Sequence, residues 1–179
     1  MKPLQICQTL GTQHVDAYFG ELSGKEIRAL LLAGGVSANV PATAYTQAAR
    51  RGHWRRRFDA EVAGGNEGVA LAFLLEWLMR HHRSMLVDYL DFLGVSHRMG
   101  ETDEDFCATR EPEKLHAGAL HLFDKHPRHH VATYLLLVGH MQETPVFDRM
   151  TDLLVALGMD EAAAQAHAAA HADPPAKAS

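Results

Sequence analysis

Histidine and carboxylate side chains at helical spacing are the residues of this sequence best suited to chemistry. Two short motifs place them three positions apart, Glu113-x-x-His116 and His140-x-x-Glu143. Residues at this spacing lie on one face of a helix, and imidazole and carboxylate groups are common metal ligands. A helical bundle that projects such pairs inward can hold metal ions. The sequence therefore supports the hypothesis of a divalent-metal site, with His82, His116, His140, Glu113 and Glu143 as the expected ligands.

The metal motifs are incomplete, and this limits the hypothesis. Only one Glu-x-x-His is present in that order, and Glu113 falls on the polar side of its predicted helix. His140 and Glu143 lie opposite the apolar stripe of theirs. Motifs of two residues also arise often by chance. The alternative is that these histidines are solvated side chains at helix ends and that no cofactor is bound.

A second histidine pair, His167 and His171, lies four positions apart in an alanine-rich segment. Such a pair can chelate zinc or nickel on an exposed helix. An alanine-rich helix has little to bury and is marginal by itself, and only two ligands are local. We therefore expect this pair to be adventitious.

A basic cluster with an aromatic residue inside it suggests a different chemistry. It consists of Arg50, Arg51, Trp54, Arg55, Arg56 and Arg57. Arginine binds phosphate well and tryptophan can stack on a base, so the cluster supports a nucleic-acid hypothesis. The alternative is a solvated face whose arginines pair with the acidic run 101–105 or with a partner.

Composition and missing motifs narrow the choice of function. The sequence contains no G-x-S-x-G motif and no P-loop, so nucleophilic catalysis and nucleotide binding of those kinds have little support. A net charge of −5 argues against a general nucleic-acid binder, although 13 histidines make that charge depend on pH. Cys7 and Cys107 fit no metal or redox spacing, and the N-terminal residues do not resemble a secretory signal, so we expect a cytoplasmic protein.

A long central helix over residues 67–93 is the element expected to position these groups. Its apolar residues recur at i, i+3, i+4 and i+7. Asn66 provides an N-cap, and Gly94 provides the left-handed residue of a C-terminal cap. Phe73 and Trp77 lie off the main stripe, so we expect neighbours on several sides. Charged residues interrupt the apolar run well before the ~20 residues that a membrane span requires.

By helical spacing His82 falls in the middle of the apolar stripe. One interpretation is a core or half-exposed histidine that is hydrogen-bonded to a neighbour. The other is a ligand or proton carrier inside the bundle.

Capping signals predict the remaining helices. A capping box at Ser23–Glu26 begins a short helix that Gly34 ends. Pro41 is expected to begin a helix that ends at Gly52. Further helices are expected from Pro112, from Pro127 to about Gln142, from Thr144-Pro145 to Leu157, and in the alanine-rich segment after Asp160.

The sequence thus predicts an all-α fold. It is a single-domain helical bundle of about six to eight helices over residues 1–172, with a disordered C-terminal tail at 173–179. Segments 127–142 and 145–157 are expected to flank the central helix. Residues 71–95 and 135–159 also align at a constant offset, through either a duplication or two similar helix ends.

Three hypotheses for the function follow. The leading one is a non-catalytic helical interaction or scaffold protein that associates with itself or a protein partner, because the chain has much apolar helix surface and no complete catalytic constellation. The first alternative is a metal-binding helical-bundle enzyme with histidine and carboxylate ligands. The second is a nucleic-acid-associated regulator that uses the cluster at 50–57. No membrane association is expected.

Overall fold

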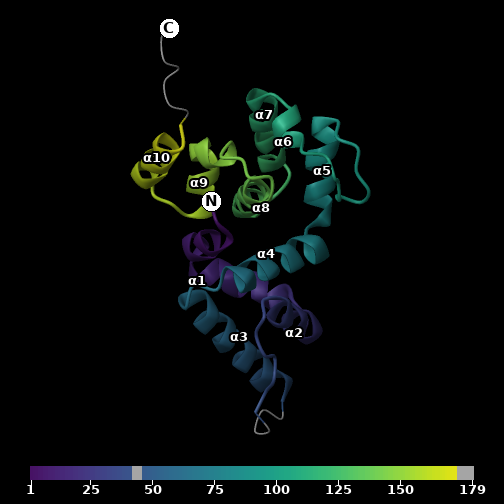
Figure 1. Cartoon of the computed structure of the whole chain (residues 1–179), viewed down its shortest axis with the longest axis vertical. Helices are drawn as coiled ribbons and strands as arrows, with labels where there is room; N and C mark the ends of the chain where they lie inside the picture. The colour runs from purple at the N-terminus through teal and green to yellow at the C-terminus, as the bar shows by residue number, and fades with distance from the viewer. Residues whose placement is uncertain (42–45, 173–179) are drawn as a thin grey trace. The chain divides into compact units, whose positions relative to one another are not determined.

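The computed structural model describes residues 1–41 and 46–172 (Figure 1). In these ranges the chain forms ten α-helices and one 3₁₀ helix, and it contains no strand beyond an isolated bridge between Arg98 and Glu101. The predicted all-α class is confirmed. The predicted disordered tail at 173–179 lies outside the described residues.

No helix in the described part of the chain is both long enough and apolar enough to cross a membrane.

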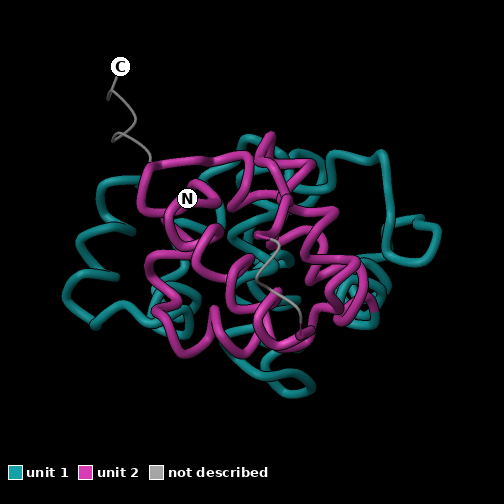
Figure 2. Tube along the Cα trace, turned by 90° about the horizontal axis from the view of Figure 1, so that it is seen from below, with its two compact units in different colours: residues 1, 84–179 teal, residues 2–83 magenta. Residues whose placement is uncertain are grey.

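The chain divides into two compact units (Figure 2). Unit 2 comprises residues 2–83, and unit 1 comprises residue 1 together with residues 84–179. Each unit has its own buried side chains and is described by itself. The single domain expected over residues 1–172 stays a prediction.

Unit 2 is built around α4, whose first turn is capped by Asn66 as predicted. Its helices are α1 (Pro3–Glu21), α2 (Gly24–Ala33), α3 (Gln47–Ala63) and α4 (Glu67–His81). Helix α4 packs chiefly against α1 and α2. Phe73 and Trp77 are fully buried, which confirms that α4 has neighbours on several sides. The ring of Trp77 stacks on that of Tyr18, with centroids 3.7 Å apart.

Unit 1 has α8 as its most buried helix. Its elements are α5 (Arg83–Leu93), α6 (Phe106–Thr109), α7 (Pro112–Phe123), α8 (Arg128–Met141), the 3₁₀ helix η1 (Phe147–Arg149), α9 (Thr151–Leu157) and α10 (Glu161–Ala170). Residues 131–137 of α8 are buried on every face because α7 and α9 pack against this helix. Tyr89 of α5 makes edge contacts with Tyr134 and Phe147 in the same core.

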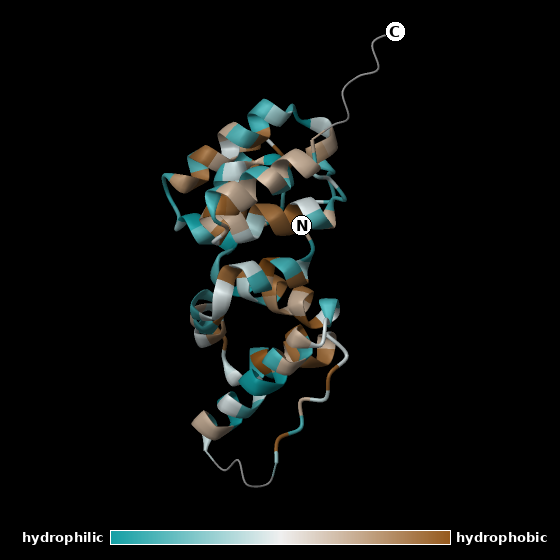
Figure 3. Ribbon diagram, turned by 90° about the vertical axis from the view of Figure 1, so that its left-hand side faces the viewer, coloured by the Kyte–Doolittle hydropathy of each residue, from teal (hydrophilic) through white to brown (hydrophobic). Residues whose placement is uncertain are grey.

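Local capping signals are confirmed at several helix ends. Ser23 and Glu26 form the reciprocal capping box, in which Glu26 Oε2 accepts the Ser23 backbone N–H at 2.6 Å. Gly94 has a φ of 68°, and the Val95 N–H donates to the carbonyl of Leu90 at 2.9 Å. Most helices carry both hydrophobic and hydrophilic residues, as amphipathic packing requires (Figure 3).

The predicted continuous helix 67–93 is two helices, because α4 ends at His81 and α5 begins at Arg83. His82 lies between them with φ −128° and ψ 26°, outside helical geometry. The expectation that segments 127–142 and 145–157 flank the central helix 67–93 stays a prediction. The main neighbours of α4 are α1 and α2, which precede it in the chain.

Helix α3 differs from the prediction at both ends. Pro41 is not helical, and α3 begins at Gln47 with Thr46 as its N-cap. The helix continues through Gly52 to Ala63. One glycine weakens a helix by only about 1 kcal/mol, and the burial of Phe58 on this helix outweighs that loss.

The helix expected from Thr144-Pro145 also begins later. A turn follows α8, then comes η1, and α9 begins only at Thr151. The Gly139 backbone lies close to Phe147, which is fully buried, so packing of η1 on α8 replaces the predicted regular helix here.

Substituting Gly34 with alanine is expected to destabilise the protein. A Cβ at this position would lie 2.8 Å from Cα of Val69, where α2 approaches α4, and backbone cannot move aside cheaply. We expect a loss of about 1–3 kcal/mol in the free energy of unfolding, measured by urea denaturation.

Gly20→Ala in the same unit is the matched control, because a Cβ there meets no atom within 4 Å. It should leave stability unchanged or raise it by up to about 1 kcal/mol. Equal effects of the two substitutions would contradict the close packing of α2 on α4.

Candidate metal centre

The structure does not gather the ligands that the sequence motifs suggested. Glu113 and His116 are exposed on α7, His140 is half-buried in the last turn of α8, and Glu143 is exposed just beyond it. Among the described residues, none of these four belongs to a group of three ligand side chains close enough to share an ion. Their role as ligands stays a prediction.

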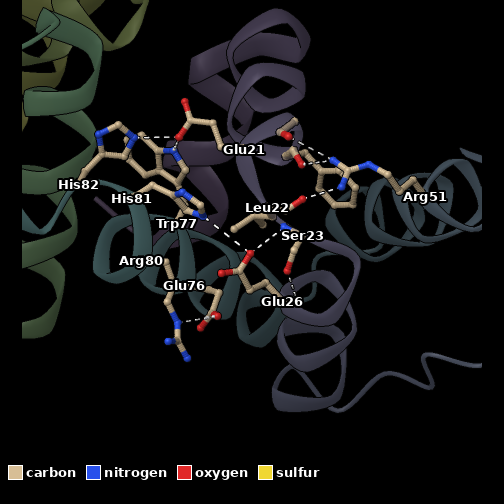
Figure 4. Close-up of polar contacts among 12 residues, drawn as sticks. Glu21, Leu22, Ser23, Glu26, Arg51, Glu76, Trp77, Arg80, His81 and His82 are labelled. Atoms are coloured by element: carbon tan, nitrogen blue, oxygen red, sulfur yellow. Dashed lines mark hydrogen bonds and ion pairs between the residues drawn. The ribbon is translucent and has the colours of Figure 1, made fainter. Parts of the chain in front are cut away.

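His82 takes part in a polar contact within unit 2 (Figure 4). Its Nε2 lies 2.9 Å from Oε2 of Glu21, and the indole N–H of Trp77 donates to the same oxygen at 2.8 Å. The His82 ring also packs against Trp77, with centroids 4.3 Å apart. The side chain is 20% exposed, so these contacts match a half-exposed histidine bonded to a neighbour.

Arg51 of the basic cluster is a structural residue. Its guanidinium donates to the backbone carbonyls of Leu22 at 2.6 Å, Phe19 at 3.0 Å and Gly20 at 3.2 Å (Figure 4). These carbonyls lie at the end of α1, where helical partners run out. Arg51 therefore closes the C-terminal end of α1 and ties it to α3.

Arg55 also lies inside unit 2. It pairs with Asp16 of α1 at 2.8 Å and with Asp59 of its own helix, and its guanidinium lies 5.5 Å from the ring centroids of Phe19 and Phe58. Only 17% of the side chain is exposed. Arg55 is consequently less available to a nucleic acid than the sequence suggests.

The remaining residues of the basic cluster differ in their contacts and in their exposure to solvent. Trp54 donates from Nε1 to the carbonyl of Ala38 at 3.0 Å, and Arg57 pairs with Glu61 at 3.2 Å. Arg50, Arg56 and Arg57 are exposed on α3. The predicted nucleic-acid contact of Arg50, Arg51, Trp54, Arg55, Arg56 and Arg57 stays a prediction, with Arg51 and Arg55 largely occupied.

Unit 1 brings together a different set of ligands, which we call the Asp-His-His cluster. It consists of Asp148 of η1, His167 of α10 and His171, the residue that caps α10. One potential ligand atom from each residue lies within 4.8 Å of the other two. Helix α10 packs against η1 and α9, and this contact brings the histidines to the carboxylate.

Two atoms of the cluster are buried without a hydrogen-bond partner. Oδ1 of Asp148 and Nε2 of His167 both lack one, and they face each other at 3.7 Å, too far for a hydrogen bond. Asp148 is only 5% exposed, and its other oxygen accepts a hydrogen bond from the Met1 amino group. Unpaired buried polar atoms are unfavourable, so this pair is the feature of the cluster that most favours ligand binding.

The surroundings of His167 favour its neutral ring, and a hydrogen bond fixes the tautomer of His171. Burial lowers the pKa of His167, and the nearby His171 lowers it further, so the neutral ring is favoured. Nδ1 of His171 lies 2.9 Å from the carbonyl oxygen of His167, which can only accept. Nδ1 of His171 therefore carries the proton, and in the neutral ring Nε2 holds the free lone pair.

The ligand set defines the class of ion that fits. Two imidazoles and one carboxylate suit Zn²⁺, Ni²⁺, Co²⁺ or Fe²⁺ better than Ca²⁺ or Mg²⁺, which prefer oxygen ligands. A tetrahedral ion at about 2.0–2.1 Å from each donor separates the donors by roughly 3.3 Å. The observed 3.7 Å between Asp148 and His167 requires only a small movement of the side chains.

No family model, curated protein or solved structure matches the chain, so its function rests on the geometry described above.

The sequence revealed part of this cluster. The i, i+4 spacing of His167 and His171 is that of a chelating pair, but the pair was expected to be adventitious because only two ligands are local. Asp148 lies 19 residues before His167 in an unremarkable segment, and no local pattern connects them. The third ligand depends on the docking of α10.

Substituting Arg51 with alanine is expected to destabilise unit 2. The change removes three hydrogen bonds to carbonyls at the end of α1 and leaves those oxygens without a donor. We expect a loss of about 1–3 kcal/mol in the free energy of unfolding, measured by urea denaturation.

Arg56→Ala is the control, because Arg56 is an exposed neighbour on the same helix. Its effect should stay within about 0.5 kcal/mol. If Arg51→Ala were as harmless, the closing of α1 by Arg51 would be refuted. Arg56→Ala also tests nucleic-acid binding without the loss of stability expected at Arg51.

Proposed function

We propose that this protein binds a transition-metal ion, with Zn²⁺ as the representative, at the Asp-His-His cluster of unit 1. The observation that carries the proposal is the pair of buried ligand atoms, Oδ1 of Asp148 and Nε2 of His167, which face each other without a hydrogen-bond partner. An ion between them would satisfy both atoms. The nearby ring of His171 would complete three protein ligands.

The geometry favours an ion that keeps open coordination positions. Three protein ligands leave at least one position of a tetrahedral ion for water or another small ligand. His167 and His171 are half-buried, although the facing ligand atoms of Asp148 and His167 are themselves buried. This proposal keeps the hypothesis of a metal-binding helical protein but replaces the predicted ligands with Asp148 of η1 and with His167 and His171 of α10 and its C-cap.

Titration of the metal-free protein with Zn²⁺ is expected to show one binding event per chain by isothermal calorimetry. His167→Ala should weaken it at least about tenfold, because even residues that only orient a metal ligand contribute roughly 10–100-fold to affinity. The imidazole that faces Asp148 is lost in this variant.

His116→Ala serves as the control, since His116 is an exposed histidine outside the cluster. Its zinc affinity should equal that of the wild type. Undiminished binding by His167→Ala would overturn the assignment of the ion to this cluster, and a loss only in His116→Ala would move it to α7.

A second candidate function is self-association, which exposed apolar side chains in unit 1 favour. Leu120 is 45% exposed, and the exposed fractions of Phe92, Met99, Met141 and Val155 lie between 37% and 63%. Exposed apolar groups contribute to interfaces when several are covered together. This candidate continues the hypothesis of an interaction or scaffold protein.

Sedimentation velocity over a hundredfold range of protein concentration tests self-association. We expect the sedimentation coefficient to rise with concentration, and Leu120→Lys to reduce that rise by adding a charge to the covered surface. The control is Glu113→Lys, which changes charge on the same helix at a position that is already polar. A concentration-independent monomer would remove this candidate.

A further inference from the structure

Helix α10 has little apolar surface with which to hold itself against unit 1. Its sequence is EAAAQAHAAA, and Ala164 is the one residue of α10 that is buried. A buried methyl group contributes only about 0.8 kcal/mol. An isolated helix of this length is also marginal in water. Docking of α10 therefore depends on contacts other than apolar burial.

The two ends of α10 are held differently. At the N-terminal end, the side chain of Asp160 accepts the Ala163 N–H at 2.9 Å, and α10 follows α9 after a short turn. At the C-terminal end, His167 and His171 face η1. The last turn of α10 is therefore the part whose position depends on the Asp-His-His cluster.

We propose that the metal ion acts as a clasp, so that docking of the C-terminal half of α10 on η1 is controlled by the ion. This inference rests on the metal binding proposed above. The three ligands come from two elements, Asp148 from η1 and the two histidines from the end of α10. An ion bound by all three cross-links these elements.

The same unpaired atoms weaken docking when the ion is absent. In the docked state Oδ1 of Asp148 and Nε2 of His167 are shielded from water and have no hydrogen-bond partner. Undocking exposes both atoms to water and relieves this penalty. A bound ion favours the docked state because it satisfies both atoms. Docking is therefore weaker without the ion and stronger with it.

The concentration of the ion relative to its Kd determines how far binding shifts the docking equilibrium of α10. A ligand that binds only the docked state favours it by a factor of one plus its concentration divided by Kd. At a free Zn²⁺ concentration 100 times Kd, the undocked population of α10 falls roughly 100-fold. An ion well above its Kd can thus control a helix that apolar burial alone holds weakly.

Hydrogen–deuterium exchange of the full chain, with EDTA or with saturating Zn²⁺, tests the clasp. We expect Zn²⁺ to slow exchange of the amides at 165–171 at least about tenfold, while the amides of α4 keep their rates. Calorimetry on the same samples reports binding separately. Zinc that binds without slowing exchange at 165–171 would overturn the clasp and leave metal binding intact. Absence of zinc binding would overturn both proposals.

Asp148→Asn distinguishes the clasp from local chelation of zinc by the two histidines alone. Two histidines at i, i+4 can chelate zinc and stabilise their own helix without any docking. A clasp needs the carboxylate, so the slowing at 165–171 should be lost in Asp148→Asn. Slowing that persists in this variant would show local chelation and refute the clasp. Unchanged exchange in α8 of the metal-free variant verifies that unit 1 remains folded.

Discussion

The carboxylate of Glu21 is the contact on which the organisation of unit 2 depends. Trp77 is fully buried, so its indole N–H needs an acceptor, and Glu21 at the end of α1 supplies one. The same oxygen contacts His82, which lies outside helical geometry. The Glu21 carboxylate therefore links the end of α1 to the end of α4. The division between the two units falls at the next residues, 83 and 84.

Helix ends that depend on local chemistry were predictable, and those that depend on tertiary contacts were not. Ser23, Asn66 and Gly94 form caps through atoms within a few residues of each other, so the sequence contains all the information. Gly52 resembled a stop, but α3 continues through it because a buried side chain supports the helix on the far side. The break at His82 involves Glu21, which is 61 residues away and cannot be found from spacing.

The residues of the candidate site likewise could be predicted from the sequence only where they lie close together in the chain. The spacing of His167 and His171 showed two possible ligands and no reason to combine them with a third, whereas Asp148 joins them only through the packing of η1 and α10. The six-residue basic cluster appeared uniform in the sequence. Its contacts separate Arg51, which closes a helix end, from Arg56, which is exposed on the same helix. Residue type identifies what a group can do, and the fold determines which groups remain available to do it.

The continuity of unit 2 in the sequence has a consequence for biosynthesis. Unit 2 consists of consecutive residues 2–83, and the main neighbours of α4, helices α1 and α2, precede it in the chain. Its core is therefore complete as soon as α4 leaves the ribosome. The roughly 100 residues that follow take about 5–20 s to synthesise, whereas helical domains fold in microseconds to milliseconds. Unit 2 can thus fold on the nascent chain before the segments that form α8, α9 and α10 have been translated.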